Sequence, residues 1–428
     1  MTGIRQSSLK KRVRQWMRRA FASLPKSTRF AIYRAMIDCD PEPDARLELK
    51  VAETREEIEA CFKLLHDAYV GSGFMKPAES GLRVTMYHAL PTTTTLCAKY
   101  DGRVVGTMSM IREGVFGFPL QSVFDLSGVR ARQGQIAEIS ALAVHPDFRK
   151  TGGAILFPLM KFMYEYCTEF FDTRHLVIAV NPEKIELYES LLFFERLQEN
   201  VVDKYDFANG APAVGATLDL SLAPAIFRKA YGRRSARKNL HNYFVMQRLP
   251  NIKLPRRRYF TTNDPVLTAE TLDYFFNKRS DVFEQLDDRR KALLWSIYDQ
   301  PEYRSVLPLL RGTPVDFHPM RRHQRFSLRC PAELRFALNE DERKIVMTVI
   351  EISLSGFQAV SNLDIPLGVA GEVRVELGVG DQSELRAQVV RHHKTSAGDF
   401  YGFKLDEPDA SWRRCVGALE TGHTAGDL

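Results

Sequence analysis

The sequence predicts an α/β domain, followed by a basic, partly helical connecting region and a small β-barrel. Three observations lead to this prediction. Strand-like and helix-like segments alternate from about residue 45. From about residue 318, short alternating runs are separated by Gly, Asp and Asn, as in small barrels. The chain has 428 residues, more than one compact core usually holds.

Changes in composition along the chain set the expected domain boundaries. We divide the chain into a basic N-terminal helical segment (1–40), the α/β domain (45–222), the connecting region (223–317), the barrel (318–410) and a tail (411–428). The composition is 44% hydrophobic and 26% charged, which excludes a wholly disordered or collagen-like chain.

The sequence also predicts a cytoplasmic protein without a metal. Its longest apolar runs, such as residues 191–194, are too short to span a bilayer, and the N-terminus lacks the apolar core of a signal peptide. The six cysteines are scattered without CxxC pairing, which argues against a disulfide framework or a zinc finger. We therefore expect reduced thiols and no metal site.

The net charge of +7 is concentrated at the N-terminus. The first 37 residues hold ten Lys or Arg and no acidic residue. Residues 4–24 predict an amphipathic helix with Trp16 and Phe21 on its apolar side. Such a helix suits an anionic membrane surface, which would place the protein at the inner face of the membrane. The pattern also fits a helix that packs on the body of the protein or binds a partner.

The α/β domain begins with a strand and a capped helix, with Thr54 as the predicted N-cap. A hairpin then turns at Asp101-Gly102. The expected elements are a strand at 47–53, a helix at 54–70, the hairpin at 94–113, a strand at 135–144, a helix at 153–171, a strand at 175–180 and a helix at 183–197. After these, residues 223–265 read as basic and irregular, and residues 266–300 as helical.

The first candidate site is a glycine turn between a strand and a helix. Gly152 and Gly153 let backbone N–H groups approach an anion, and the helix N-terminus adds partial positive charge. Arg149 adds a full positive charge, and Ala154 continues the turn. This combination predicts a phosphate cradle.

This stretch resembles the GNAT acyltransferases, whose R-x-x-G-x-G/A pattern matches Arg149, Gly152 and Ala154. The resemblance covers about 45–222. It implies that the phosphate and pantetheine arm of a thioester donor lie along residues 149–154, with Asn181 after the next strand. It also implies that Tyr188 can protonate the departing thiolate; a ring packed under the sheet is the alternative.

Within this family, the sequence is most similar to the acyl-carrier-protein-dependent branch. This branch comprises the N-acyl amino acid synthases and the acyl-homoserine-lactone synthases. The motif E-I-S-x-L-A-V at 138–144 and the segment 73–96 carry this similarity. It implies acyl carrier protein, or acyl-CoA, as the donor. Ala141 stands where synthases of this branch often have Arg, and this departure leaves the amine acceptor open.

The attacking amine must lose a proton, and the sequence offers one well-placed base. Glu138 lies on the central strand and could take this proton directly or through water; a structural carboxylate is the alternative. An amino-acid carboxylate would suit a bidentate arginine, for which Arg83 and Arg112 are candidates.

Acyl carrier proteins are acidic, so a basic docking patch is expected. The basic run at 228–238 could supply it through Arg228, Lys229, Arg233, Arg234, Arg237 and Lys238. No recognition motif for nucleic acid accompanies these charges, so we expect no nucleic-acid partner.

The second candidate site precedes and enters the barrel. Arginines in a flexible lead-in offer planar forks to phosphates and can stack on purines. This region resembles the PilZ domain over about 318–408. Its R-x-x-x-R motif matches Arg321 and Arg325, with Arg322 as a further contact; D/N-x-S-x-x-G matches Ser353 and Gly356, with Glu351 in place of Asp or Asn. The resemblance implies cyclic di-GMP as ligand, and a barrel that has lost binding is the alternative.

Together these sites predict an N-acyltransferase that moves a long acyl group from acyl carrier protein to the amine of an amino acid or similar small molecule. Cyclic di-GMP would regulate it. Two alternatives are a catalytically inactive scaffold that responds to cyclic di-GMP and an N-acetyltransferase that uses acetyl-CoA.

Overall fold

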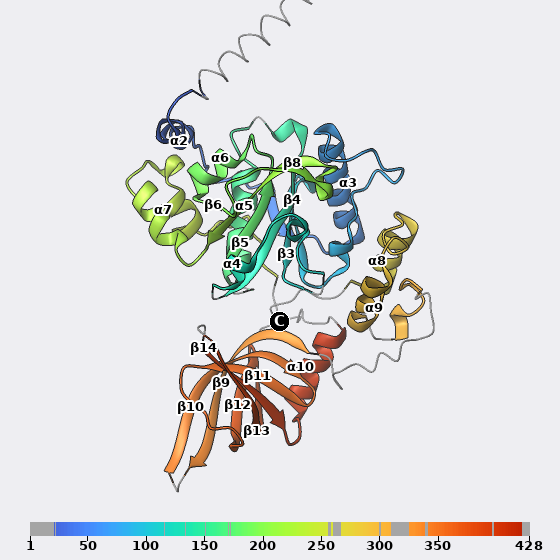
Figure 1. Cartoon of the computed structure of the whole chain (residues 1–428), viewed down its shortest axis with the longest axis vertical. Helices are drawn as coiled ribbons and strands as arrows, with labels where there is room; N and C mark the ends of the chain where they lie inside the picture. Colours follow the sequence, from blue (N-terminus) through green and yellow to red (C-terminus); the bar gives the residue numbers. More distant parts are fainter. Residues whose placement is uncertain are drawn as a thin grey trace, which may run out of the picture.

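The computed structural model describes residues 21, 23–114, 116–132, 134–149, 151–169, 171, 173–255, 258–259, 267–298, 301–309, 325–338, 341–395 and 398–421. Figure 1 shows an α/β domain and a separate closed barrel, as the sequence predicts. Most of the amphipathic segment 4–24 lies outside the described residues, so its helix stays a prediction. Within the described residues, no helix is long and apolar enough to cross a membrane.

The α/β domain is built on one sheet in which neighbouring strands run antiparallel, except for the parallel pair β4–β5. The strand order is β1-β2-β3-β4-β5-β8-β6, and β7 also pairs with β8. The strands are β1 (Leu47–Val51), β2 (Thr93–Tyr100), β3 (Arg103–Arg112), β4 (Gln135–Val144), β5 (Thr173–Val180), β6 (Glu195–Arg196), β7 (Val202–Tyr205) and β8 (Ala211–Asp219). The predicted turn is confirmed, because Asp101 and Gly102 both have positive φ, at 49° and 78°.

Helices cover both faces of this sheet. The bounds are α2 (Lys26–Ala35), α3 (Arg55–Gly71), α4 (Ser127–Arg130), α5 (Leu156–Glu169) and α6 (Ile185–Leu187), with short turns η1 (Met86–Ala89), η2 (Pro119–Ser122), η3 (Pro146–Phe148) and η5 (Asp206–Ala208). Thr54 caps α3 by accepting the N–H of Glu57 at 3.2 Å, as predicted. Helix α5 packs with the core on one face, and α3 packs with a second core on the other.

The predicted helix at 183–197 is shorter than expected. After α6 the chain makes a π-helical turn, η4 (Tyr188–Leu192), and the helix ends at Phe193, which has a left-handed φ of 61°. The following pair Glu195–Arg196 bonds to β8 as the strand β6. The sheet edge therefore takes over residues that local pattern assigned to the helix.

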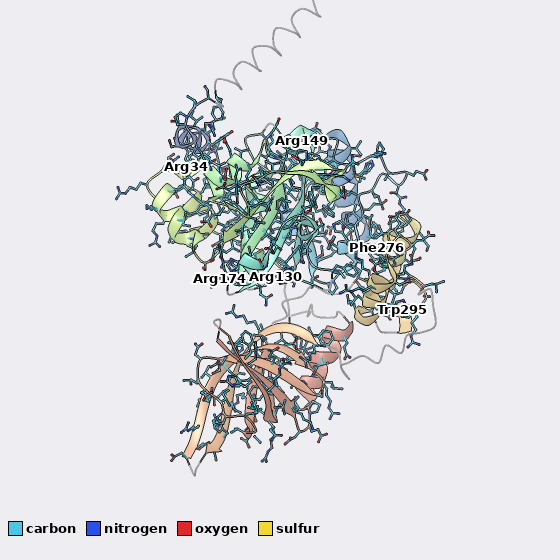
Figure 2. The ribbon with its side chains drawn as sticks, in the orientation of Figure 1. Arg34, Arg130, Arg149, Arg174, Phe276 and Trp295 are labelled. Carbon is cyan, nitrogen blue, oxygen red and sulfur yellow. The ribbon has the colours of Figure 1, made fainter. Side chains whose placement is uncertain are left out.

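Much of the connecting region folds onto the α/β domain. Residues 223–231 are helical (α7, Ala223–Tyr231), so the irregular structure predicted there is wrong; Phe227 and Tyr231 bury against the core. Further on come η6 (Ala236–Lys238), η7 (Asn242–Met246), α8 (Ala269–Asp273), η8 (Tyr274–Lys278), α9 (Asp288–Ile297) and η9 (Pro301–Tyr303). α8 and α9 share the core of α3, and Figure 2 shows Phe276 and Trp295 in this layer.

The barrel is closed in the order β10-β11-β14-β13-β12-β9. Its strands are β9 (Phe326–Leu338), β10 (Asp341–Ser353), β11 (Gly356–Ser361), β12 (Ala370–Gly378), β13 (Asp381–Thr395) and β14 (Gly398–Leu405). The predicted tail is instead helical over α10 (Ala410–Thr421). Its apolar residues recur at helical spacing and bury in the barrel core: Trp412, Cys415, Val416 and Leu419.

Among the described residues before the barrel, Arg258 and Tyr259 contact it. Lys253 still bonds to the α/β domain, through its N–H to the carbonyl of Leu49 at 2.8 Å. Five residues later, Arg258 forms two hydrogen bonds with Asp381, at 2.7 and 3.2 Å, and Tyr259 is buried in the barrel core. We name the described residues 253–255 and 258–259 the strap; the five residues from Lys253 to Arg258 can span at most about 18 Å.

Candidate active site and effector site

Strands β4 and β5 part in the middle of the sheet. They pair from Gln135 with Thr173 to Glu138 with Val177, and no pair follows, although both strands continue. Ala141 of β4 has a left-handed φ of 54°, and the register against β3 shifts beside it. This bulge turns Ala141 toward the α3 side of the sheet, whereas Ala137 faces α5. The result is an opening between two central strands.

A cavity of about 80 Å³ lies at this opening. Its lining comes from both parted strands and from aromatic residues elsewhere in the chain. The lining residues are Tyr69, Phe74, Glu138, Ser140, Ala179, Val180, Asn181, Tyr205, Phe207, Ala208, Ala211, Pro212 and Ala213. The fold thus brings the predicted base Glu138 and the predicted donor contact Asn181 to one cavity.

Glu138 is the buried carboxyl of this cavity. It is 1% exposed, and its Oε2 accepts the N–H of Leu120 at 3.0 Å. Burial raises the pKa of Glu138 to about 8, against the smaller opposing effect of the Leu120 N–H. A carboxyl whose pKa lies near the working pH can both accept and release a proton.

Aromatic residues form one wall of the cavity, and they were missed in the sequence. Arg83 lies behind this wall: its guanidinium is 4.1 Å from the ring centre of Tyr69 and 4.9 Å from that of Phe207. It also donates to the carbonyl of Phe207 at 2.9 Å. Tyr69, Phe74, Tyr205 and Phe207 fall on separate segments without a shared motif, so no local pattern marks them.

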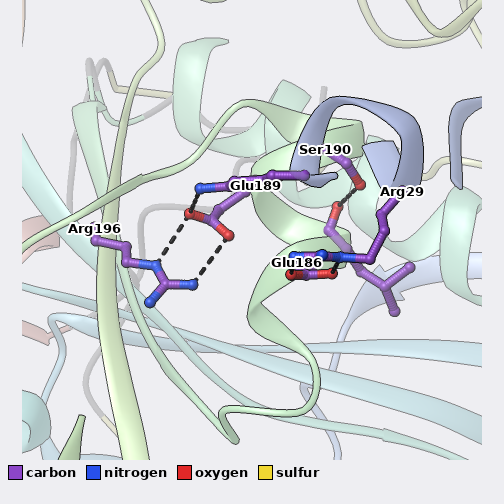
Figure 3. Close-up of polar contacts among 7 residues, drawn as sticks. Arg29, Glu186, Glu189, Ser190 and Arg196 are labelled. Carbon is purple, nitrogen blue, oxygen red and sulfur yellow. Dashed lines mark hydrogen bonds and ion pairs between the residues drawn. The ribbon is translucent and has the colours of Figure 1, made fainter. Parts of the chain in front are cut away.

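Tyr188 begins the π-helical turn, and residues outside it hold the turn from two sides. Figure 3 shows Arg29 of α2 bonded to Glu186, with distances of 3.0 and 2.5 Å. Glu189 bonds to Arg196 at 3.0 Å and to Lys26 at 3.0 Å. Such turns often occur at functional sites.

The carbonyls at the end of this turn have no helical partner, because the helix stops at Phe193. Arg34 of α2 donates to the carbonyl of Ser190 at 2.8 Å, and the hydroxyl of Tyr231 in α7 donates to that of Leu191 at 2.8 Å. Burial, and the neighbouring Tyr69, raise the pKa of Tyr188. The Tyr188 phenol therefore keeps its proton at neutral pH.

The glycine turn joins β4 to α5 in the predicted way. Gly152 and Gly153 have φ of 67° and 93°, which favour glycine, and a Cβ on Gly153 would lie 2.6 Å from the ring of Phe157. Arg149 is held by a bond from its Nε to the carbonyl of Val144 at 2.8 Å. Figure 2 shows Arg149 at the end of the domain opposite Arg130 and Arg174.

Backbone donors are free at this turn. Within the described residues, no backbone carbonyl accepts the N–H of Gly152, Gly153 or Ile155. Ala154 closes a turn by donating to the carbonyl of Thr151 at 3.3 Å. The free donors at the start of α5 can bind an anion.

The barrel carries a larger and more open pocket, of about 590 Å³. Arg325, Glu351, Ser353 and Gly356 line it, so the structure brings together the described residues of the two barrel motifs. Arg325 and Glu351 form an ion pair at 2.5 Å, and Ser353 donates from its hydroxyl to the carbonyl of Gly356 at 3.0 Å. Arg321 and Arg322 lie outside the described residues.

Gly356 has no room for a side chain, because a Cβ there would lie 2.4 Å from the carbonyl oxygen of Phe403. The motif glycine therefore permits the tight pairing of β11 with β14. Arg391, His393 and Lys404 also line the pocket, and Arg391 of β13 and Lys404 of β14 add positive charge. Sequence reasoning missed these residues, because they stand far from the two motifs.

Comparisons with known families match these two regions separately. Residues 60–219 match the family model of the N-acyl amino acid synthase FeeM, and residues 319–419 match the PilZ domain model. Each match covers less than half of the chain. We call the α/β domain the synthase domain and the barrel the PilZ domain, after the models that they match. No curated protein matches the sequence.

Solved structures resemble the chain in fold. FeeM, an N-acyl amino acid synthase from uncultured soil microbes, is 22% identical, with a TM-score of 0.37, covering 42% of this chain and 94% of its own. The CoA-dependent acyl-homoserine lactone synthase BjaI is 19% identical (TM-score 0.35; 48% and 92%). YcgR from Escherichia coli, in complex with c-di-GMP, is 17% identical (TM-score 0.20; 24% and 46%).

Two predicted contacts of the synthase domain make structural bonds, and one of them lies away from the cavity. Arg112 does not line the cavity: its guanidinium is 3.6 Å from the ring centre of Phe171, and it donates to the carbonyl of Pro91 at 2.9 Å. Asn181 lines the cavity, but its side chain accepts the N–H of Glu183 at 2.9 Å. Asn181 thus also shapes the turn that follows β5.

Part of the basic run beside the synthase domain has a structural role. Arg234 and Lys238 donate to carbonyls at the end of α2, those of Arg34 and Ala35, each at 2.8 Å. Arg237 pairs with Asp38 at 2.6 Å and with Asp40 at 3.4 Å. These three residues fix the end of α2 and are not free for a partner; Arg228, Lys229 and Arg233 remain exposed.

Within the described residues, no cluster of His, Cys, Asp or Glu could hold a metal ion. All six cysteines are buried, and none of them forms a disulfide.

Proposed function

We propose that this protein transfers a long-chain acyl group from acyl carrier protein to the amine of an amino acid or a similar small molecule. We further propose that cyclic di-GMP, bound by the PilZ domain, regulates this transfer. The observation that carries the first proposal is Glu138, a buried carboxyl with a raised pKa at the point where β4 and β5 part. It would supply a base beside the opening at which we propose that the thioester arm lies.

Glu138 is the proposed general base. The ammonium form of the acceptor gives a proton to the ionised Glu138, and the neutral nitrogen attacks the thioester carbon. The C–N bond forms, the C–S bond breaks, and Tyr188 gives its proton to the departing thiolate. The second proton of the nitrogen restores Tyr188, and Glu138 releases its proton to solvent. Holding both substrates at the parted strands makes the attack effectively intramolecular.

The glycine turn is proposed to hold the phosphate of the donor arm. The N–H groups of Gly152, Gly153 and Ile155, which no described backbone carbonyl accepts, precede α5, and Arg149 adds charge. The donor is proposed to be acyl carrier protein, docked through the exposed Arg228, Lys229 and Arg233. The proposed amphipathic segment 4–24 would keep the enzyme at the inner face of the membrane, where an acylated product partitions.

The test of the enzymatic proposal is product formation. Purified protein is incubated with acyl-loaded carrier protein and a mixture of amino acids, and N-acylated products are sought by mass spectrometry. Parallel reactions contain acyl-CoA or acetyl-CoA instead. Product from the carrier protein supports the proposal; product from acetyl-CoA alone identifies an acetyltransferase. No product from any donor, despite binding of cyclic di-GMP, identifies a scaffold.

The pocket of the PilZ domain is proposed to bind cyclic di-GMP through Arg325 and the positive charges of Arg391 and Lys404. Ser353 and Gly356 complete the motif. The ion pair between Arg325 and Glu351 must open for Arg325 to reach a phosphate. Calorimetry with cyclic di-GMP on the full chain tests this assignment; absence of binding would refute it.

The strap supports the proposed regulation, because it ties the two domains at one edge. On the synthase side, Leu49 of β1 bonds to Asn251 and Lys253. On the PilZ side, a Cβ on Gly378 would overlap the carbonyl of Arg258, so the strap lies directly on β12. Ligand-induced movement of the barrel would therefore reach β1 through five residues.

A further inference from the structure

A buried tyrosine hydroxyl beside Glu138 has no partner within the described part of the chain. Tyr205, at the end of β7, lines the cavity and is 4% exposed. Its Oη has no hydrogen-bond partner among the described residues. Native proteins seldom leave a buried hydroxyl unpaired, because desolvation then goes uncompensated. This hydroxyl is therefore placed to bind a group that enters the cavity.

A second group behind the same wall lacks a counter-charge. Arg83 is 9% exposed, and among the described residues no carboxylate lies within ion-pair distance of it. Its partners include the side chain of Tyr69, the ring of Phe207 and the carbonyl of Phe207. Buried charges are usually paired, so the positive field of Arg83 favours an anion in the adjoining cavity.

The protonation state of the Tyr205 phenol decides whether its hydroxyl can donate a hydrogen bond. Burial first, and Glu138 second, raise the pKa of Tyr205, so the hydroxyl keeps its proton and can donate. The group that accepts this hydrogen bond and also opposes the charge of Arg83 is an acid oxygen.

We propose that Tyr205 is a specificity-determining residue that donates a hydrogen bond to the acid group of the amine acceptor. The acceptor then presents its amine to Glu138 and its carboxylate to Tyr205, while Arg83 acts through its field from behind the aromatic wall. This proposal rests on the proposed function, because it concerns the acceptor of the same reaction.

The test compares two acceptors that differ only in the acid group: an α-amino acid and the matching α-amino amide, with the same acyl donor. The wild type should prefer the amino acid. In Tyr205→Phe, kcat/KM for the amino acid should fall about tenfold or more, because a hydrogen bond to a charged group is lost. The value for the amide should change little, so the preference falls by the same factor.

Tyr243→Phe is the matched control. Tyr243 is 1% exposed, its Oη also lacks a partner among the described residues, and its ring packs against Phe157 and Phe244, outside the cavity. Both substitutions remove an unpaired buried hydroxyl, so neither should lower the melting temperature. Only Tyr205→Phe should alter the preference between acceptors.

Three results would overturn the proposal: unchanged kcat/KM for the amino acid, an equal fall for both acceptors, or a loss of thermal stability in Tyr205→Phe that Tyr243→Phe does not show. The last would mean that the hydroxyl is bonded within the protein. A wild-type enzyme that acylates neither acceptor refutes the proposed function itself, whereas an active wild type with an indistinguishable Tyr205→Phe refutes the role of Tyr205 alone.

Discussion

The two pockets of this protein use opposite physical means. The cavity of the synthase domain is small, about 80 Å³, and its key carboxyl is withdrawn from water. The pocket of the PilZ domain is larger, about 590 Å³, and its Arg325 is 41% exposed at the side chain. In the cavity of the synthase domain, burial raises the pKa of Glu138 into the neutral range. In the pocket of the PilZ domain, exposed charges would meet the proposed charged ligand with little desolvation. Chemistry is expected where a proton must move, and signalling where an anion must come and go.

The largest expected effect concerns the buried carboxyl in the cavity of the synthase domain. Glu138→Gln keeps the shape and the hydrogen bond with the Leu120 N–H but cannot take a proton. We expect kcat to fall by about 10²- to 10⁴-fold, as for loss of a general base. Acylated product is measured by mass spectrometry, with binding of cyclic di-GMP as the control for folding. Full activity would remove Glu138 from the mechanism.

The same substitution carries a stability signature with a defined sign. The pKa of Glu138 is raised by burial from its ordinary 4.5 to about 8, so the native state keeps a proton that the unfolded state loses between these values. The wild type should therefore lose stability as pH rises from about 4.5 to 8, and Glu138→Gln should not. Denaturant unfolding at pH 5 and pH 8 measures this; parallel behaviour of both proteins would contradict the raised pKa.

The next largest effect concerns the exposed pocket of the PilZ domain. Arg325→Ala should weaken cyclic di-GMP binding about tenfold or more, because a charge-assisted contact to phosphate is lost. Glu351→Asn is the matched variant: it removes the carboxylate that pairs with Arg325, and affinity should rise several-fold. Calorimetry compares both variants with the wild type. Unchanged affinity in Arg325→Ala would remove that arginine from the site.

A smaller effect should appear where the two domains meet. Arg258→Ala breaks the paired hydrogen bonds with Asp381, and Asp381→Asn weakens them from the other side. Both variants should bind cyclic di-GMP normally but lose several-fold of its effect on the acyl-transfer rate. Initial rates with and without ligand give this coupling directly. Regulation that survives both substitutions would show that the strap carries no signal.

The smallest effect should come from the residues that hold the Tyr188 turn. Arg29→Met removes the bidentate contact with Glu186, and kcat should fall about two- to tenfold with KM for the acceptor unchanged. Lys26→Met is the control, because the Lys26 side chain is more exposed, at 56% against 17%. An equal and large effect in both variants would indicate general loss of folding instead.

Sequence predicted the parts of this molecule that depend on local pattern. The hairpin at Asp101-Gly102, the Thr54 cap and strand β4 all appear where expected, because turn chemistry and periodicity act over a few residues. The helix α10 was missed, although Trp412 and Leu419 follow a helical spacing in the supposed tail.

What sequence could not supply was the meeting of distant segments. Tyr69, Tyr205 and Phe207 reach Glu138 only through the pairing of β7 with β8 and the packing of α3. Nor does any local pattern show that Arg112 turns onto Phe171, away from the cavity. The position of Glu138 on the strand was predictable, whereas its burial depends on the whole fold.

The pH dependence of kcat tests the central claim most directly, namely that the buried Glu138 is the base. Rates for the wild type and Glu138→Gln are measured from pH 6 to 9 with saturating donor and acceptor. The account predicts that the wild-type rate rises with pH through about 8, as Glu138 ionises, and that this limb is absent from the residual rate of the variant. A limb near pH 8 that persists in Glu138→Gln, or a wild-type rate that stays flat across the range, would contradict it.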